Sequence, residues 1–206
     1  MGEEENYREL VDKYISIYRS KVAPILKNQD ETRKFMVFLS SLNTFLEENK
    51  LGRIIIVGGF AAEIYTGRGY RTADVDIIVE GNFAEKFVCE VLERIGYVRE
   101  ARVYIQDFGE LVEKAIDIVG TMYDRPMKPI KWKISIDNFY VYIIPPEEII
   151  ISSLASAKFW NVGIDFERAA MIYYAQKDNI DHSYLIKRAR EENVEDTLNE
   201  IFKLCS

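Results

Sequence analysis

One stretch in the first half of the sequence restricts the fold more than any other. Residues 53–57 form a short run rich in β-branched residues, and this run ends at Gly58-Gly59. A helix-favouring stretch covers residues 60–65, and a second β-branched run starts at Asp74. Such runs predict strands when turn residues bound them. The stretch therefore predicts a strand, a tight turn, a helix and a second strand, as in folds that mix helices with a sheet.

Three aspartates stand within apolar strand sequence. Asp74 and Asp76 are two positions apart, so they share one face of their strand. Asp117 occupies a similar setting in Ala115-Ile116-Asp117-Ile118-Val119, where an unpaired buried charge would be expensive. Neighbouring carboxylates need a counter-charge, and their hard oxygen atoms suit Mg²⁺ or Mn²⁺. We expect a divalent metal ion at Asp74 and Asp76, with Asp117 as a third ligand from another strand.

The residues around the first turn favour binding of phosphate. Gly58 and Gly59 permit a close approach to the backbone, and the start of the following helix offers unpaired N–H groups and a positive dipole. Arg68 and Arg71 lie between this helix and Asp74, and a guanidinium can bind phosphate oxygens in a forked geometry. These four residues are the predicted binding residues for a triphosphate.

Together these motifs resemble the nucleotidyltransferase superfamily, which has the polymerase-beta-like fold. The resemblance is carried by Val57-Gly58-Gly59-Phe60-Ala61, by Arg71-Thr72-Ala73-Asp74-Val75-Asp76-Ile77 and by Ile116-Asp117-Ile118. The sequence pattern is similar to the one shared by antibiotic nucleotidyltransferases and abortive-infection toxins. The resemblance covers about residues 50 to 180. The sequence departs from those proteins at Ser153, where a Lys is expected, and Asp165 and Arg168 follow.

The resemblance implies an enzyme that transfers a nucleoside monophosphate from an NTP to a hydroxyl acceptor. Gly58 and Gly59 match the phosphate-binding turn, Asp74 and Asp76 match two metal ligands, and Asp117 matches the carboxylate that activates the acceptor hydroxyl. The implied cofactor is Mg²⁺ or Mn²⁺, and two such ions would stabilise the attacking and leaving oxygens.

The whole chain is predicted to be α+β, with a mixed sheet, packed helices and helical segments at both ends. We expect an N-terminal helical segment at 1–50, in which Asp30 caps a second helix, a nucleotidyltransferase core at 51–146 and a C-terminal helical segment at 147–206. Four to six strands are expected, and the further strand candidates lie at 97–108, 114–119, 130–136 and 139–144.

Composition limits the partners. The sequence has 27 Lys and Arg against 34 Asp and Glu, a net charge of −7, which argues mildly against a large RNA as acceptor. No apolar run is long enough to span a membrane and no signal peptide is recognisable, so a cytoplasmic location is expected. Cys89 and Cys205 are interpreted as ordinary thiols, and His182 as a solvated residue at a helix start.

Several interpretations stay open at this stage. The acceptor can be a small molecule, which we favour, a protein side chain or a tRNA. A catalytically silent protein of the same fold, such as a toxin–antitoxin component that docks a partner through its N-terminal helices, is the alternative to an enzyme. The aromatic residues of those helices are interpreted first as core. A basic and aromatic patch is interpreted first as an edge strand guarded by lysines and second as a nucleic-acid contact; it contains Tyr123, Arg125, Lys128, Lys131, Trp132 and Lys133.

Overall fold

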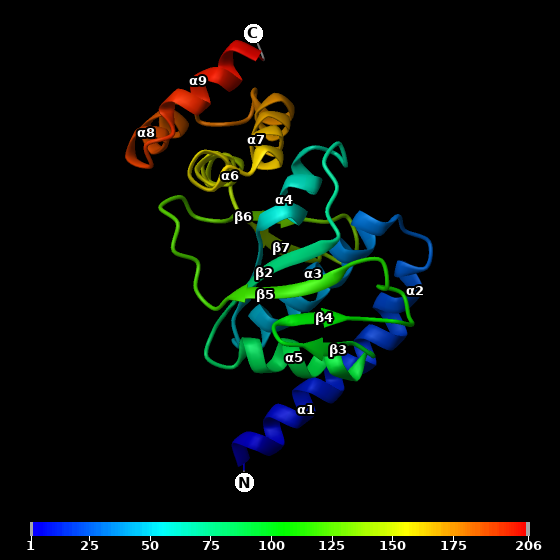
Figure 1. Ribbon diagram of the computed structural model, residues 1–206. Helices are drawn as coiled ribbons and strands as arrows, with labels where there is room; N and C mark the ends of the chain where they lie inside the picture. The colour runs from blue at the N-terminus through cyan, green and yellow to red at the C-terminus, as the bar shows by residue number, and fades with distance from the viewer. Residues whose placement is uncertain (1, 205–206) are drawn as a thin grey trace. The chain divides into compact units, whose positions relative to one another are not determined.

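The computed structural model describes residues 2–204, with side chains from residue 7 onward, so Cys205 lies outside the described residues. The chain forms two compact units. Figure 1 shows the helices and strands that make them up. Unit 1 comprises the chain up to Ile56, Ala73–Asp124 and Lys131–Ile143. Unit 2 comprises Val57–Thr72, Arg125–Ile130 and the chain from Ile144 onward. The predicted N-terminal segment therefore belongs to the same unit as most of the predicted core.

Unit 1 is built on a mixed sheet with the strand order β3-β4-β5-β2-β1-β7-β6. The central strands β1 and β2 are antiparallel, whereas β1 pairs with β7 and β2 pairs with β5 in parallel. The strands are β1 (Arg53–Ile56), β2 (Asp74–Glu80), β3 (Val98–Glu100), β4 (Val103–Ile105), β5 (Ala115–Gly120), β6 (Ile130–Lys133) and β7 (Tyr140–Ile143). This sheet and its helices confirm the predicted α+β class.

The sheet contains seven strands within the described residues, more than the four to six predicted. The excess arises at residues 97–108, which were expected to form one strand. There the chain turns at Ala101, whose φ of 57° lies in the left-handed region, and β3 and β4 pair as an antiparallel hairpin. Alternating apolar residues predict strand conformation, but they do not reveal a turn that contains neither Gly nor Pro.

The helices of unit 1 include the predicted N-terminal pair with one irregularity. They are α1 (Gly2–Ile17), η1 (Tyr18–Val22), α2 (Ala23–Leu26), α3 (Glu31–Glu48) and α5 (Ala84–Arg94). Asp30 caps α3, because its carboxylate accepts a hydrogen bond of 3.1 Å from the Arg33 backbone N–H, as predicted. The π-helical turn η1 follows α1, and Pro24 stands in the first turn of α2, where a proline is tolerated.

Aromatic packing holds the helices of unit 1 together. Tyr14 of α1 makes edge contacts with Phe45 of α3 and Phe87 of α5, and the last two rings are stacked with centroids 5.5 Å apart. All three residues are buried. The interpretation of the N-terminal aromatic residues as core is therefore confirmed, and burial of such rings is a major part of the stabilisation of a core.

A buried asparagine fastens α3 to the sheet. Asn43 accepts a hydrogen bond of 2.7 Å from the Ile54 backbone N–H of β1. Its amide donates a bond of 3.0 Å to the Tyr140 backbone oxygen of β7. The Thr44 hydroxyl is a second, longer donor to the same Tyr140 oxygen at 3.5 Å. Asn43 has 0% exposure, so it bonds these two strands from within the core rather than through water.

Unit 2 is helical, and its helices are α4 (Gly58–Tyr65), α6 (Pro146–Trp160), α7 (Gly163–Gln176), α8 (His182–Glu191) and α9 (Glu195–Leu204). Gln176 of α7 donates a hydrogen bond of 2.7 Å to the backbone oxygen of Tyr65 in α4. The buried Arg188 of α8 forms an ion pair of 3.3 Å with the buried Glu148 of α6. Helices α6 to α9, the first of which begins at Pro146, agree with the helical C-terminal part of the predicted fold class.

A smaller prediction concerns the start of α8. Asp181 caps this helix by accepting a hydrogen bond of 2.9 Å from the Tyr184 backbone N–H. His182 is exposed at the first helical position, and its ring makes an edge contact with Tyr173. The prediction that His182 is a solvated residue at a helix start is confirmed.

Candidate functional site

The structure places the three predicted aspartates on adjacent strands of unit 1. In the parallel pair β2 and β5, Asp76 stands directly opposite Asp117, and Asp74 stands opposite Ala115. Residues at matching positions of neighbouring strands lie about 4.8 Å apart and point to the same face of the sheet. Asp74 and Asp76 share that face through alternation. The backbone therefore gives all three carboxylates one face of the sheet.

A β-bulge lies next to these residues. The register of β2 and β5 shifts between Ile77 and Ile78, because Ile77 pairs with Ile118 whereas Ile78 pairs with Gly120. Val119 is the extra residue, and it is 40% exposed. Bulges bend a strand and alter the direction of side chains, and they are common beside functional sites. The bulge ends the regular pairing just after the Asp76 and Asp117 positions.

The surroundings of the three carboxyl groups differ. Asp74 is exposed, Asp76 is half-buried, and Asp117 is buried with 6% exposure. Asp117 Oδ2 forms an ion pair of 3.0 Å with Arg102 Nε. Asp117 Oδ1 is buried and has no hydrogen-bond partner. One oxygen of Asp117 is thus neutralised and the other is left for a group that the polypeptide does not supply.

These residues fit a hard divalent cation by their chemistry. Carboxylate oxygens are the ligands that Mg²⁺ and Mn²⁺ prefer, and the unpartnered Asp117 Oδ1 is a suitable donor atom. Across residues 2–204, however, no group of three or more His, Cys, Asp and Glu side chains is arranged to hold a metal ion. The backbone is in place for a site with three ligands, but the side chains have not converged.

The predicted diglycine turn lies in unit 2, at the start of α4. Gly58 has a φ of 57°, a conformation that residues with a Cβ adopt only with strain. Gly59 is buried against Thr72, since a Cβ at this position would lie 2.8 Å from the Thr72 hydroxyl oxygen. The two positions therefore require glycine for different reasons. Gly58 permits the turn, and Gly59 permits close packing of α4 on the segment that leads to Asp74.

Arg68 and Arg71 also lie in unit 2, and both are exposed. Arg68 has a φ of 74°, so it belongs to a tight turn that follows α4. Arg71 Nε lies 3.7 Å from Oε2 of Glu63. The predicted phosphate-binding residues are thus grouped in one unit, and the predicted metal ligands in the other.

Two residues with a role near the predicted site were not identified from the sequence. Arg102 is the ion-pair partner of Asp117. Glu63, with 0% exposure, accepts a hydrogen bond of 3.1 Å from the Thr72 backbone N–H. A glutamate within the apolar stretch 60–65 was an available signal for Glu63, because a buried charge requires partners. No local pattern marks Arg102.

The departure at Ser153 also has a structural counterpart in unit 2. Arg168 of α7 donates a hydrogen bond of 2.9 Å from Nε to the hydroxyl oxygen of the buried Ser153. Asp165 holds the same guanidinium with an ion pair of 3.0 Å. The guanidinium of Arg168 on α7 therefore lies beside Ser153, the residue that stands where the resemblance leads one to expect a lysine.

In unit 1, Tyr104 and Cys89 are two side chains that could act as nucleophiles in place of the carboxylates. Tyr104 of β4 pairs with Ile116, the residue before Asp117. Burial is the main cause that raises the pKa of the Tyr104 phenol and the pKa of the Cys89 thiol. Both groups are therefore protonated at neutral pH and poor nucleophiles. The interpretation of Cys89 as an ordinary thiol agrees with this.

The basic and aromatic patch contains an edge strand. β6, which carries Lys131, Trp132 and Lys133, is the last strand in the sheet order. The ammonium group of Lys131 lies 3.5 Å from the ring centroid of Tyr140 on the neighbouring strand β7. Lysines on an edge strand oppose pairing with other chains, so the first interpretation of the patch is supported.

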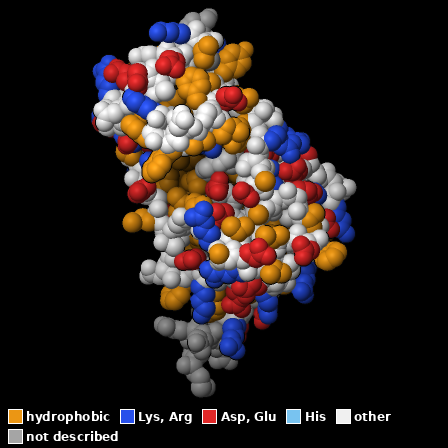
Figure 2. All heavy atoms as spheres, in the orientation of Figure 1, with side chains coloured by type: hydrophobic (Ala, Val, Ile, Leu, Met, Phe, Trp, Pro, Cys, Tyr) orange, Lys and Arg blue, Asp and Glu red, His pale blue; other side chains and the backbone are white. Residues whose placement is uncertain are grey.

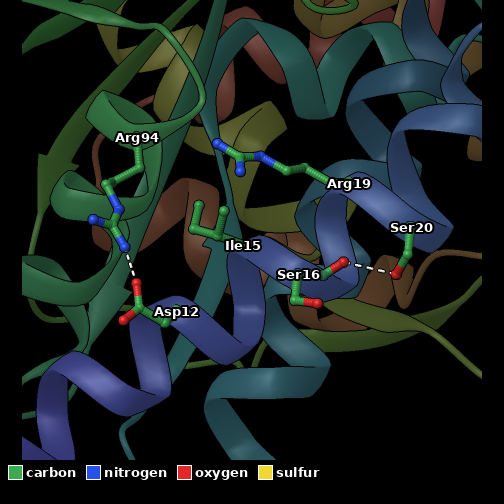
Figure 3. Close-up of a pocket in the computed structure, with 6 residues that line it drawn as sticks. All are labelled: Asp12, Ile15, Ser16, Arg19, Ser20 and Arg94. Atoms are coloured by element: carbon green, nitrogen blue, oxygen red, sulfur yellow. Dashed lines mark hydrogen bonds and ion pairs between the residues drawn. The ribbon is translucent and has the colours of Figure 1, made fainter.

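An open pocket of about 570 Å³ lies elsewhere in unit 1 and contains none of the predicted site residues. Figure 3 shows Arg94 of α5 ion-paired with Asp12 of α1, and Arg19 extending over Ile15. The Ser20 hydroxyl donates a hydrogen bond of 2.7 Å to the Ser16 backbone oxygen. The polar groups that line this pocket therefore partly bond to one another.

The chain order of these elements is β1, α4, β2 and β5, with the diglycine at the start of α4 and the aspartates on β2 and β5. This is the order that the nucleotidyltransferase resemblance predicts. In the described part of the chain, no helix is both long and apolar enough to cross a membrane.

Comparison with known proteins gives structural matches alone. No family model matches the chain, and no curated protein matches it. A solved structure of an antigenic nucleotidyltransferase-like protein from Paracoccidioides brasiliensis matches at 18% identity with a TM-score of 0.49, over 70% of this chain and 76% of that one. The antibiotic-resistance factor ANT(2'')-Ia matches at 18% identity with a TM-score of 0.48, over 84% of this chain and 97% of that one. Neither similarity assigns an activity to this chain.

Proposed function

We propose that the protein is a metal-dependent nucleotidyltransferase. It would transfer a nucleoside monophosphate from an NTP to a hydroxyl group and release pyrophosphate. The observation that carries this proposal is the pairing of Asp76 with Asp117 on parallel strands, with Asp74 on the same face and one buried Asp117 oxygen unpartnered. Asp74, Asp76 and Asp117 would hold Mg²⁺ or Mn²⁺, which would neutralise charge on the phosphates.

The other predicted residues receive roles in binding the nucleotide. The helix start at Gly58 offers backbone N–H groups to phosphate oxygens, and Gly59 lets α4 pack against Thr72. The exposed guanidinium groups of Arg68 and Arg71 would bind the triphosphate in a forked geometry. Asp117 would accept the proton of the attacking hydroxyl group, as the resemblance implies.

A small molecule with a hydroxyl group is the acceptor we favour. On the face drawn in Figure 2, Lys and Arg side chains are interspersed with Asp and Glu, and the described residues form no broad basic surface there. A net charge of −7 also disfavours a large polyanion. A protein side chain or a tRNA is the less favoured acceptor. We also propose a cytoplasmic location, which fits the interpretation of both cysteines as ordinary thiols.

The decisive experiment measures NTP binding with and without Mg²⁺ or Mn²⁺ by calorimetry, and pyrophosphate release from each NTP with candidate acceptors. The double variant Asp74→Asn with Asp76→Asn should lose at least about 100-fold in metal-dependent turnover, because metal charge contributes several kcal/mol to such reactions. Asp137→Asn is the matched control: Asp137 is exposed at φ 48°, which Asn tolerates, between β6 and β7 at the other end of the sheet. Equal turnover in the double variant and in the wild type would refute the proposal.

A second candidate is supported by the side-chain arrangement. Because no three acidic side chains among the described residues are arranged to hold a metal ion, and Arg102 already pairs with Asp117, a silent protein of this fold would look similar. Such a protein would act by docking a partner, as a toxin–antitoxin component does, and would bind no NTP with metal. The same calorimetric titration of the folded wild-type chain separates the two candidates.

A further inference from the structure

Asp117 is the one predicted metal ligand that is both buried and already partnered by a cation. Its side chain is 9% exposed, and Oδ2 lies 3.0 Å from Arg102 Nε. Oδ1 has no hydrogen-bond partner. A buried carboxylate without any counter-charge is costly, so Arg102 provides the positive charge that this position requires when no metal ion is bound.

The position of Arg102 follows from the strand ladder. Arg102 directly precedes β4, whose first residue, Val103, stands opposite Asp117 on β5. The Arg102 backbone oxygen also accepts a hydrogen bond of 3.5 Å from the Ile118 N–H. The backbone of Arg102 is therefore held next to Asp117 by main-chain pairing, independently of the ion pair.

The side chain of Arg102, by contrast, is 70% exposed. It can leave Asp117 for solvent without removing apolar surface from the core. Release of the exposed guanidinium therefore costs little by itself, and an incoming divalent ion replaces the positive charge that the buried Asp117 requires. Asp117 stays buried in either state, because its place is fixed by β5.

We propose that Arg102 is the resident counter-cation of Asp117 and competes with the metal ion for this carboxylate. This inference rests on the proposed function, since it assumes that Asp117 is a metal ligand. A guanidinium in contact with Oδ2 and a divalent ion on the same carboxylate repel each other. Metal binding therefore requires release of Arg102 from Oδ2, and the unpartnered Oδ1 is the second carboxylate oxygen that the ion can then bind.

Competition has a distinctive consequence. Removal of the Arg102 charge should strengthen metal binding, because the ion no longer displaces a partner. A residue that only orients Asp117 would have the opposite effect, since its removal would weaken metal binding. The sign of the change thus separates a competitor from an orienting residue.

The experiment is a titration of the full chain with Mn²⁺ by calorimetry, in the absence of nucleotide. Arg102→Gln should bind Mn²⁺ about five-fold more tightly than the wild type, the upper range for loss of an exposed pair. Arg102→Lys should be intermediate, since it keeps the charge but loses the forked geometry. Asp117→Asn should bind more weakly than the wild type.

Arg99→Gln is the matched control. Arg99 belongs to the same hairpin and is exposed, but its guanidinium bonds to the Ala101 backbone oxygen at 2.7 Å instead of Asp117. The Arg99→Gln substitution removes the same charge from the same hairpin. Because general electrostatics would affect both variants alike, only a larger gain in Arg102→Gln than in Arg99→Gln supports the proposal.

Thermal melting provides a second readout. Without metal, Arg102→Gln should melt below the wild type, because Asp117 is left buried without a counter-charge. Saturating Mn²⁺ should raise the melting temperature of Arg102→Gln more than that of the wild type.

The failures are distinguishable. If Asp117→Asn weakens Mn²⁺ binding but Arg102→Gln binds no more tightly than Arg99→Gln, competition is refuted and the proposed metal site stands. If neither the wild type nor Arg102→Gln binds Mn²⁺, both the inference and the metal-dependent function fail.

Discussion

The two units hold their predicted site residues in different ways. In unit 1, Asp76 and Asp117 are fixed by main-chain pairing of β2 with β5. In unit 2, Arg68 and Arg71 lie in the loop that follows α4, and the adjoining Thr72 backbone is held by the buried side chain of Glu63. A strand ladder distributes the positional constraint over many hydrogen bonds, whereas a loop depends on a few side chains. Single substitutions should therefore disturb the two sets of residues to different degrees.

The largest effect on stability is expected where unit 1 departs from this rule, at Asn43. Asn43→Ala removes the side-chain acceptor of the buried Ile54 N–H and the shorter of two side-chain hydrogen bonds to the Tyr140 oxygen. Loss of about 3 kcal/mol in the free energy of unfolding is expected, because an orphaned buried polar group costs about 1–3 kcal/mol. Denaturant unfolding followed by circular dichroism measures it.

Asn49→Ala on the same helix is the control for this prediction. Asn49 is half-buried, and its amide bonds to the Phe45 backbone oxygen at the end of α3. It should cost clearly less than Asn43→Ala, since water can replace the lost bond. Equal losses would show that the hydrogen bonds from Asn43 to the sheet contribute no more than the half-buried bond of Asn49, and the sheet would then be self-sufficient.

Glu63 tests the loop of unit 2. Glu63→Ala should reduce the free energy of unfolding by about 2 kcal/mol, because the Thr72 N–H loses its buried acceptor. Hydrogen exchange should show faster exchange of the Thr72 amide, while the amides of β2 and β5 keep their protection. Glu63→Gln retains an acceptor oxygen and should recover part of the loss. Faster exchange throughout β2 in Glu63→Ala would contradict the independence of the two constraints.

The smallest effect on stability is expected at Gly59, and it tests the packing of α4 against Thr72. In Gly59→Ala the new Cβ would lie 2.8 Å from the Thr72 hydroxyl oxygen, so a loss of about 1 kcal/mol is expected from overpacking. Adding Thr72→Ala removes that oxygen and should restore stability in part. A double-mutant cycle of thermal melting measures the coupling. Additive losses would mean that Thr72 is not the obstacle.

The same comparison shows how far sequence reasoning reaches. Alternation along a strand predicts that Asp74 and Asp76 share a face, and a diglycine after a β-branched run predicts the turn at Gly58. These are local properties, and the structure shows both in β2 and at the start of α4. The hairpin within residues 97–108 was missed, because its turn at Ala101 has none of the residues that mark turns.

The sequence by itself determined which residue types stand on each strand, because side-chain alternation and turn chemistry depend on neighbours in the chain. The tertiary structure alone decided which strands are neighbours. Pairing of β2 with β5 brings Asp76 beside Asp117, and pairing of β4 with β5 brings Arg102 to the same carboxylate. Such contacts join residues distant in sequence, and they arise from burial and main-chain pairing across the whole sheet, which no local pattern records.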